Sequence, residues 1–470
     1  VSHKQGIRVE LAPDADQSVL MGRHCGLSRV VENFCLETVR KKWAQRKAEE
    51  SYGITGDDLT TVPWSAPALE KEWRAAHIVR FPWFTENKLS SRVPKEACRV
   101  RAAGFSNYLK SKKGERRGAR MGFPSWRKRK HGSRFRYDAD RAKPRDARTV
   151  RLPAVGDVAT REDMSWLTDR MATGQARILG ATVREQAGRW WISFQIEVDR
   201  DDLNKRRQVD AEAPACGIDL GLKTFAVIKN SDGTTEEVHA PKPLKAAQRA
   251  LKRANRKLAR SADDSKNRAK ARKRVGRLHL RVADRRRDFL HKTTTRLTRT
   301  KSAIAVETLH VKGMVRNRRL ARSIADAGFG EFVRQLDYKA DWYGSRIWRA
   351  DRWFPSSKTC GDCGRINRAL VLADRAWMCP GCGVLHDRDE NAAGNLLAAM
   401  LADRTSTTSP GSCPESRNAC GDHVRPHSPE SAAVSEAGRA EARTSPRLTQ
   451  RFDLPAECRS RCWRSSARSC

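Results

Sequence analysis

Alternating apolar and polar residues predict a mixture of strands and helices in the first half of the chain. The stretch GIRVELAP is typical of a short strand, and apolar residues at helical spacing predict a helix from Asp16 to about Trp43. Residues 148–200 alternate with period two around a turn at Glu185–Gly188, which predicts a small barrel or sheet domain. Residues 201–213 are polar and indicate a linker.

The next region begins with short apolar runs and continues with long helical segments. ACGIDLGLKTFAVIKNSDGTTEEVHA predicts three strands, with a turn at Asn230–Gly233 between the last two. Residues 243–300 are rich in Ala, Lys, Arg and Leu and nearly free of Gly and Pro. They predict two antiparallel helices with a break near Ser261–Ser265.

The remaining ordered part is predicted to alternate strands and helices again. SAIAVETL indicates a buried strand, Phe329 to Tyr343 an amphipathic helix, and SRIWRADRWF another strand, while a last helix is expected to open at Asp387. Beyond Asp403 the chain is rich in Ser, Thr, Pro, Arg and Glu and poor in apolar residues. Such a segment cannot bury enough surface to offset its ordering entropy, so we expect it to be disordered.

The charge of the chain points to a polyanionic partner. Its 470 residues include 94 Lys and Arg against 55 Asp and Glu, which gives a formal net charge of +39. Solubilising surface charge usually intersperses both signs, whereas KSKKGERRGAR and KNRAKARKRVGRLHLR are almost purely basic. Phosphate contacts release counterions and add affinity whatever the base sequence. Nucleic acid is therefore the expected partner.

The hydropathy and cysteine patterns indicate the cellular compartment in which the protein is expected. No apolar run reaches the roughly 18 residues that a membrane span requires, and the first residues, VSHKQGIRVE, lack the apolar core of a secretory signal. We therefore expect no membrane partner. The 13 cysteines include two tight CxxC pairs, which suggest thiolates kept reduced for metal. These features predict a cytoplasmic protein.

The segment GFPSWRKRK places aromatic rings among cations. Ring stacking on bases beside phosphate contacts would suit single-stranded nucleic acid. The alternative is that both rings close a small core and the cations are solvated. The basic faces of the helices in residues 243–300 could likewise be merely solvated. The candidate nucleic-acid contacts are Phe123, Trp126, Arg127, Lys128, Arg129 and Lys130.

Four cysteines have the spacing of a zinc ribbon. Cys360 and Cys363 form one CxxC pair, and Cys379 and Cys382 form the second. Each pair makes a tight knuckle, and two knuckles supply four thiolates for tetrahedral Zn²⁺. Since four thiolates leave no open position, the metal would be structural. A redox-active CxxC is the alternative, and two pairs at ribbon spacing argue against it.

Three acids interrupt apolar surroundings and are candidate catalytic metal ligands. Asp219 lies within GIDLG, Glu307 ends AIAVE, and Asp389 lies in DRDENAAGN at the first turn of a predicted helix. Buried carboxylates are costly unless they are paired or bind a cation. Together the three would suit Mg²⁺ or Mn²⁺, and two such ions can promote phosphodiester hydrolysis.

Asp387 competes with Asp389 for the third position. Residues two apart on a helix point to nearly opposite sides, so both are not expected to bind the same metal. One of them could instead cap the helix or complement its dipole.

The order of these motifs resembles the split RuvC nuclease of the TnpB (OrfB) family and the related small type V CRISPR effectors. GIDLG, AIAVE, the four-cysteine ribbon and DRDENAAGN follow in that order, and DRWFPSSKTCGDCG is especially close to the family. IRVELAPDADQSVL, FPWF and GFPSWRKRK are similar more loosely. The resemblance spans about residues 5–400 and is strongest over 215–398. Gly394 departs from the family pattern without touching the acids.

The resemblance implies an α/β fold with several parts. These are an RNase H-like RuvC domain with inserted helices and a zinc ribbon, and an N-terminal β-barrel wedge domain carrying a helical recognition insertion. The implied boundaries are 1–40 and 145–200 for the wedge, 41–144 for the recognition insertion, 214–402 for the nuclease domain with its helical insertion at 243–300 and ribbon at 355–386, and 403–470 for the tail.

The resemblance also implies a function, an RNA-guided DNA endonuclease with Asp219, Glu307 and Asp389 as metal ligands. A guide RNA would pair with double-stranded target DNA and displace one strand as single-stranded DNA. Two other hypotheses are an RNA-guided DNA-binding repressor that does not cut, and a transposase. The presence of all three acids argues against the first. Only five tyrosines occur, none beside a His-x-His pair, which argues against the second.

Overall fold

A computed structural model describes residues 2–405, apart from residues 117, 130, 131, 140, 200–207 and 372. These residues belong to the first of two compact units, residues 1–421. The expected tail from residue 406 onward lies outside the described residues, as does most of the expected linker. Within the described part, no helix has both the length and the apolar character needed to cross a bilayer.

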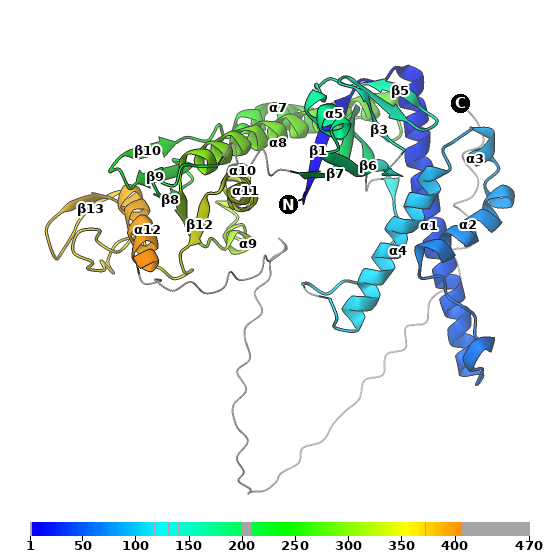
Figure 1. Ribbon diagram of the computed structural model, residues 1–470, viewed down its shortest axis with the longest axis horizontal. Helices are drawn as coiled ribbons and strands as arrows, with labels where there is room; N and C mark the ends of the chain where they lie inside the picture. The colour runs from blue at the N-terminus through cyan, green and yellow to red at the C-terminus, as the bar shows by residue number, and fades with distance from the viewer. Residues whose placement is uncertain are drawn as a thin grey trace, which may run out of the picture. The chain divides into compact units, whose positions relative to one another are not determined.

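Two antiparallel sheets form the strand-rich part of the N-terminal region (Figure 1). The predicted hairpin is confirmed, since Ala187 and Gly188 connect its strands with φ values of 56° and 78°. A four-stranded sheet has the order β1 (Ser2–Leu11), β7 (Arg189–Asp199), β6 (Ala176–Gln186) and β2 (Ser133–Asp138), and a three-stranded sheet has the order β3 (Lys143–Asp146), β4 (Thr149–Leu152) and β5 (Gly156–Ala159).

Strand β2 falls inside residues 41–144, which were expected to form the helical insertion. Its alternating pattern buries Phe135 and Tyr137, and it pairs with β6 along its whole length. The segment 133–138 therefore belongs to the sheet, and the helices of the insertion end before it.

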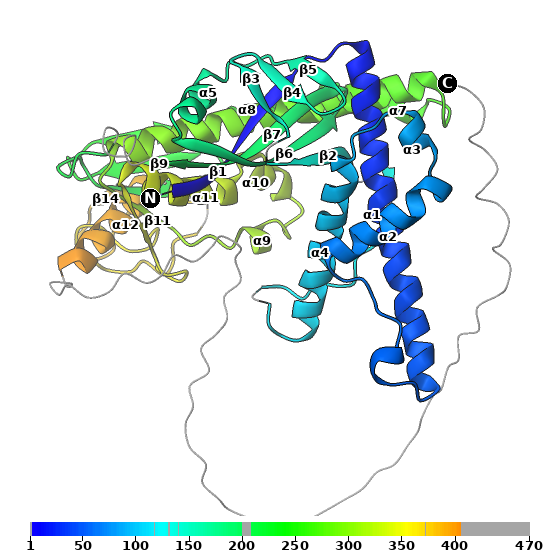
Figure 2. The ribbon, with the colours of Figure 1, turned by 45° about the vertical axis from the view of Figure 1, so that its right-hand side comes forward.

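Helices α1, α2 and α4 pack side by side, as Figures 1 and 2 both show. Helix α1 begins with a capping box between Asp14 and Gln17 and continues to Ser51, beyond the predicted end at Trp43. Within this extension, Glu49 accepts hydrogen bonds from the backbone N–H and the hydroxyl of Thr60. The helices of this region are α1 (Ala15–Ser51), η1 (Gly56–Asp58), α2 (Ala66–Arg80), α3 (Trp83–Glu86), α4 (Arg92–Lys112) and α5 (Ser165–Ala172).

A five-stranded mixed sheet organises the C-terminal region. The three strands predicted after Ala215 form an antiparallel meander. A later strand pairs in parallel with the first strand of the meander, and one further strand pairs in parallel with that later strand. The strand order is β10 (Thr235–Val238), β9 (Ala226–Asn230), β8 (Cys216–Leu220), β11 (Ala303–Val306) and β12 (Arg346–Arg349). The region is thus mixed α/β.

Helices cover both faces of this sheet. On one face, residues from α8 and α11, such as Leu297 and Phe332, form a core with Ile218 and Val306. The predicted break between the two basic helices is confirmed, since Ser265 caps α8. The helices and the remaining strands are α7 (Pro243–Ala259), α8 (Lys266–Thr300), α9 (Val311–Met314), α10 (Ala321–Ala327), α11 (Phe329–Tyr343), β13 (Ala376–Met378), β14 (Leu385–Asp387) and α12 (Arg388–Thr405).

Helix α12 covers the opposite face through unusually small residues. Ala303 and Ala305 of β11 contact Leu396 and Leu397 of the helix. In β8, a Cβ atom at Gly217 would overlap the carbonyl oxygen of Ala393 and lie 2.7 Å from the backbone nitrogen of Leu397. Glycine at this position therefore allows the helix backbone to approach the strand two residues before Asp219.

We expect Gly217→Ala to lower the free energy of unfolding by about 1–3 kcal/mol, the usual cost of overpacking, because its Cβ meets backbone atoms. The control is Gly22→Ala within α1, where no atom lies within 4 Å of the new Cβ. That change should stabilise the helix by up to about 1 kcal/mol. Urea denaturation of both variants measures the difference, and equal stabilities would contradict the close approach.

Candidate metal centres

Asp219 and Glu307 extend from the carboxyl ends of two neighbouring parallel strands. Asp219 lies near the end of β8, and Glu307 directly follows β11, which pairs with β8. Because side chains alternate between the faces of a strand, Asp219 shares the face of Gly217 and Glu307 shares the face of Ala305. Helix α12 covers that face. Both acids therefore lie on the side of the sheet from which α12 supplies the third.

Asp387 and Asp389 have different partners at the start of α12. Asp387 Oδ1 accepts hydrogen bonds from the backbone N–H groups of Asp389 (3.0 Å) and Glu390 (2.9 Å), so Asp387 caps the helix. The carboxylate of Asp389 lies 3.3 Å from the guanidinium of Arg375. The sequence left open which of the two acids caps the helix. Because Asp387 occupies the capping position, Asp389 remains the candidate metal ligand.

The three acids interact electrostatically. Burial raises the pKa of Asp219 to about 8, and the charges of Glu307 and Asp389 add to the rise. The cations Arg388 and Arg375 oppose it without cancelling it. A carboxylate whose ionised form is disfavoured in this way gains most from a bound cation. The donor set of three carboxylates therefore fits Mg²⁺ or Mn²⁺, which prefer oxygen ligands.

The spacing of the acids bears on how many ions they could hold. Among the described residues, the groups whose ligand atoms all lie within 4.8 Å of one another do not include these three carboxylates together. A single ion ligated by all three would need a closer approach.

Glu307 has a hydrogen-bond partner that the sequence analysis missed. The hydroxyl of Ser356 donates to Glu307 Oε1 at 2.6 Å, and Ser356 itself is buried. Its only sequence signal is its place in FPSSKTC, four residues before the first cysteine of the ribbon.

The four predicted zinc ligands converge. The Sγ atoms of Cys360 and Cys382 lie 3.6 Å apart, as do those of Cys363 and Cys379, and all four lie within 4.8 Å of one another. Four sulfurs bound to Zn²⁺ at about 2.3 Å would be about 3.8 Å apart in a tetrahedron. The cysteines are free thiols. Geometry and chemistry therefore both fit a structural zinc ion.

The knuckle backbone favours thiolate at one of these cysteines. The N–H groups of Cys382 and Gly381 point toward Cys379 and lower the pKa of its thiol to about 6. A thiolate is the form that binds zinc, so this knuckle is arranged for metal in advance of binding.

His386 is a further residue that the sequence analysis missed at the ribbon. Its Nε2 lies 3.0 Å from Cys360 Sγ and 3.5 Å from a carboxylate oxygen of Asp362. Its ring packs on Trp377. The spacing of four residues after Cys382 is the signal that could have found it. As a hydrogen-bond donor to the Cys360 sulfur, His386 would stabilise this candidate zinc ligand without binding the metal itself.

Two of the predicted nucleic-acid contacts have structural partners. Phe123 packs against Trp43 and Phe105 and joins the N-terminal core. Arg127 is buried, forms a close ion pair with Glu32, and donates to the carbonyl of Arg134. The alternative of a small core is thus supported for Phe123. Arg127 is neither solvated nor free for phosphate, because breaking a buried ion pair leaves an uncompensated charge.

The other four predicted contacts differ in their exposure and in whether the structure describes them. Trp126 is 40% exposed, with Arg40 beside its ring. Arg129 and Lys128 are exposed, whereas Lys130 lies outside the described residues. The segment thus offers Trp126 and Arg129 to a partner, while Arg127 anchors it.

The two basic helices enclose a groove lined by cations. Helices α7 and α8 pack against each other (Figure 1), and the groove along them has a volume of about 1240 Å³. Among the described residues that line it there is no Asp or Glu. Cations from both helices face it, among them Arg253, Lys257, Arg260, Lys270, Arg274 and Arg281. Such a surface attracts phosphates.

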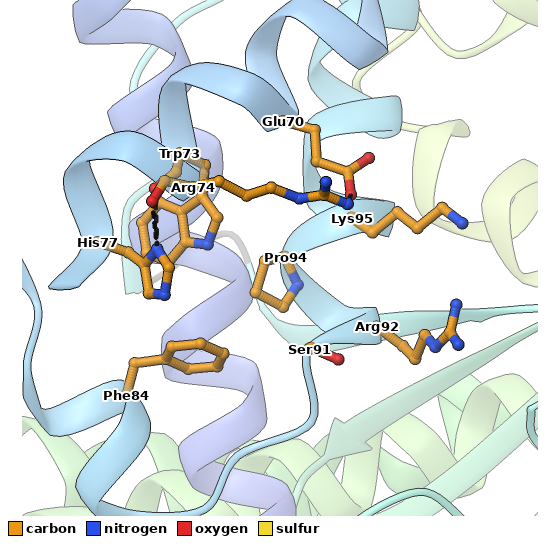
Figure 3. A pocket seen from close by; sticks show the side chains of 9 residues that line it. All are labelled: Glu70, Trp73, Arg74, His77, Phe84, Ser91, Arg92, Pro94 and Lys95. Carbon is orange, nitrogen blue, oxygen red and sulfur yellow. Dashed lines mark hydrogen bonds and ion pairs between the residues drawn. The ribbon is translucent and has the colours of Figure 1, made fainter.

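A smaller pocket lies between α2, α3 and the start of α4 (Figure 3). It has a volume of about 300 Å³, and Figure 3 shows the rings of His77 and Phe84 on one side with Pro94 and Arg92 on the other. His77 stacks on Trp73, which is almost fully buried. The aromatic wall is therefore part of the core of this region, and the cations lie at its rim.

Comparison with known proteins relates the chain to nucleases and transposon proteins. Residues 193–318 match a family model described as "Probable transposase" (OrfB_IS605), and residues 329–396 match "Cas12f1-like, TNB domain". A "Putative RNA-guided DNA endonuclease" of Streptomyces pristinaespiralis is 32% identical over 444 residues, which cover 94% of this chain and 96% of the relative. Another protein of that description, from Escherichia coli K12, is 27% identical, with 84% and 92% covered.

Among solved structures, a Cas12f1–sgRNA–target DNA complex matches over 84% of this chain and 98% of the other. The sequence identity is 14% and the TM-score is 0.41. A likeness at this level carries no weight for the assignment, which depends on the sequence relatives.

We expect metal-free protein to lose stability as pH rises, because of Asp219. Its pKa is raised from 3.8 to about 8, so the folded state holds a proton that the unfolded state releases. Stability should therefore fall between pH 5 and 8, and Asp219→Asn should remove at least about 1 kcal/mol of that fall. Asp57→Asn, at an exposed carboxylate, is the control. Urea denaturation across pH measures the slopes, and identical slopes for wild type and Asp219→Asn would contradict this.

We expect Cys363→Ser to empty the ribbon without disturbing the core. Cys363 is exposed, so the change removes a ligand but no packing. Zinc content should fall from about one ion per chain to a small fraction of it. The control is Cys25→Ala, which changes a buried cysteine of α1 outside the ribbon; this variant should keep the full zinc content of the protein. Elemental analysis after dialysis decides, and full zinc in Cys363→Ser would show that this thiolate is no ligand.

Proposed function

The chain belongs to the TnpB (OrfB) family, and from this membership we propose that it is an RNA-guided DNA endonuclease that hydrolyses phosphodiester bonds. The relative from Streptomyces pristinaespiralis supports the proposal because the match extends over nearly the full length of both chains. The observation that supports it most is electrostatic: burial and the charges of Glu307 and Asp389 raise the pKa of Asp219, and the strands that carry Asp219 and Glu307 are paired neighbours.

The proposed nuclease domain has an RNase H-like, RuvC-type fold. The strand order β10-β9-β8-β11-β12, with an antiparallel meander joined to two parallel strands, supports it. We place this domain at 214–402, with the recognition helices inserted in a wedge domain built from the N-terminal sheets. Because β2 pairs with β6, the second wedge segment would begin near residue 133 rather than at 145.

In the proposed mechanism, Asp219, Glu307 and Asp389 hold Mg²⁺ or Mn²⁺ through their carboxylate oxygens. A bound cation pair would supply an activated water and charge stabilisation at the leaving oxygen. Ser356 orients Glu307 through its hydrogen bond, and Asp387 keeps the first turn of α12 in place as its cap. The four cysteines hold Zn²⁺ in the ribbon.

The proposed partners are a guide RNA, double-stranded target DNA and the displaced single strand. Helices α7 and α8 would contact phosphates through their cation-lined groove, and the exposed Trp126 and Arg129 could contact unpaired nucleotides. The rim of the pocket in Figure 3 adds Arg92 and Lys95 to this set.

The test uses full-length protein purified with its bound RNA, a DNA duplex matched to that RNA, and Mg²⁺. Wild type should cut the duplex. In Asp219→Asn the cleavage rate should fall by more than about 100-fold, which is the loss typical of residues that only support metal ligands. Asp387→Asn is the matched control, since Asn caps helices as well as Asp and activity should stay within a few-fold. Wild-type occupancy of the target without strand scission would overturn the proposal in favour of a repressor.

A further inference from the structure

Two asparagines of α12 hold the loop that leads into the first cysteine knuckle. Asn391 and Asn395 lie one helical turn apart, and each is only 8% exposed. The Nδ2 groups of both donate to the carbonyl of Thr359, each at 2.7 Å. Asn395 also donates to the carbonyl of Ser356 at 2.8 Å, and Asn391 Oδ1 accepts the N–H of Gly361 at 2.9 Å. We call this set of bonds the asparagine clamp.

The chemistry of the partners determines the amide orientations. Asn395 faces two carbonyl oxygens, so only its NH₂ group can lie there. Asn391 faces one carbonyl and one N–H, which again permits a single orientation. Both side chains are thus buried with their NH₂ groups hydrogen-bonded, and a side chain without these donors would leave buried carbonyls unpaired.

The loop held by the clamp reaches both metal centres. Cys360, almost fully buried, lies between Thr359 and Gly361, so the clamp brackets a zinc ligand on both sides. At the other end of the loop, the hydroxyl of Ser356 donates to Glu307. A continuous path of hydrogen bonds therefore connects the first knuckle, α12 and one of the three acids.

The first turn of α12 is also held from its other side. Glu390 accepts from Lys229 Nζ (2.7 Å) on β9 and from the hydroxyl of Thr235 (2.6 Å) on β10. Asp389 directly precedes Glu390 and Asn391 in the first turn of α12, so its position depends on both attachments. The sheet supplies one attachment permanently, whereas the ribbon loop can supply the other only while it is ordered.

We propose that Asn391 and Asn395 are positioning residues that make the geometry of the acids depend on zinc in the ribbon. With zinc bound, Cys360 is held and Thr359 presents its carbonyl to the clamp. Without zinc, the ribbon has too little core to stay folded, so the clamp loses its acceptors and Ser356 no longer orients Glu307. This inference rests on the proposed nuclease function only for its consequence in cleavage.

The first experiment measures hydrogen exchange in the full-length protein and needs no cleavage. In wild type, removing zinc with a chelator should speed exchange of the amides at residues 389–395 by about tenfold or more, because their local opening becomes easier. In Asn391→Ala/Asn395→Ala the same amides should exchange fast even with a full zinc content. Amides of α11, which the clamp does not touch, should be unchanged in every sample and report on global unfolding.

Two further variants separate hydrogen bonding from packing. Asn395→Asp keeps the shape of the side chain but loses both donors, so it should behave like the alanine variant. Asn230→Ala is the control, since the Asn230 side chain is similarly buried but donates to the hydroxyl of Thr234 within its own turn. Wild-type exchange in Asn395→Asp would overturn the inference, as would zinc-insensitive exchange of α12 in wild type. Asn395→Asp also serves if the double variant does not fold.

The second experiment measures the Mg²⁺ concentration for half-maximal cleavage. Clamp variants should need about 10- to 100-fold more Mg²⁺, the range typical of residues that support metal ligands, with DNA occupancy unchanged. A Mg²⁺ requirement equal to that of Asn230→Ala would overturn the positioning role. If wild type itself does not cut, the proposed function fails, whereas the exchange experiment still tests the clamp.

Discussion

The packing of α12 against the sheet is the contact on which both candidate metal centres depend. Gly217 lets the helix backbone reach β8, and the small side chains of Ala303 and Ala305 let it lie flat on β11. Asp219 and Glu307 emerge from the same face, so the start of the helix brings Asp389 toward them. Larger residues on this face would hold the helix away, and the acids would no longer influence one another.

The same arrangement concentrates negative charge where the fold offers little compensation. Burial and two neighbouring carboxylates disfavour the charge on Asp219, and the opposing effect of Arg388 and Arg375 does not cancel the rise in its pKa. The ribbon has the complementary weakness, a small core around Cys360 and Trp377 that four thiolates must complete. A bound cation would therefore stabilise each candidate centre, and the loop that the two centres share lies against α12.

Much of the fold was predictable because its signals are local. The hairpin at Ala187–Gly188, the break before α8 and the bounds of α11 follow from turn residues, caps and apolar periodicity over a few positions. Longer-range outcomes were missed. The pairing of β2 with β6 and the extension of α1 past Trp43 involve partners elsewhere in the chain, such as Thr60 for Glu49.

The sequence by itself determined the chemistry of the candidate centres, namely which cysteines form knuckles and which acids end apolar strands. It also determined the positive net charge that favours binding to a polyanion. These properties reside in residue type and close spacing. Only the tertiary structure decided that Asp387 caps α12 and that Arg127 pairs with Glu32 rather than facing solvent. It also revealed Ser356, His386 and the asparagine clamp. A side chain's role depends on what lies across from it, and those neighbours come from segments that only folding brings together.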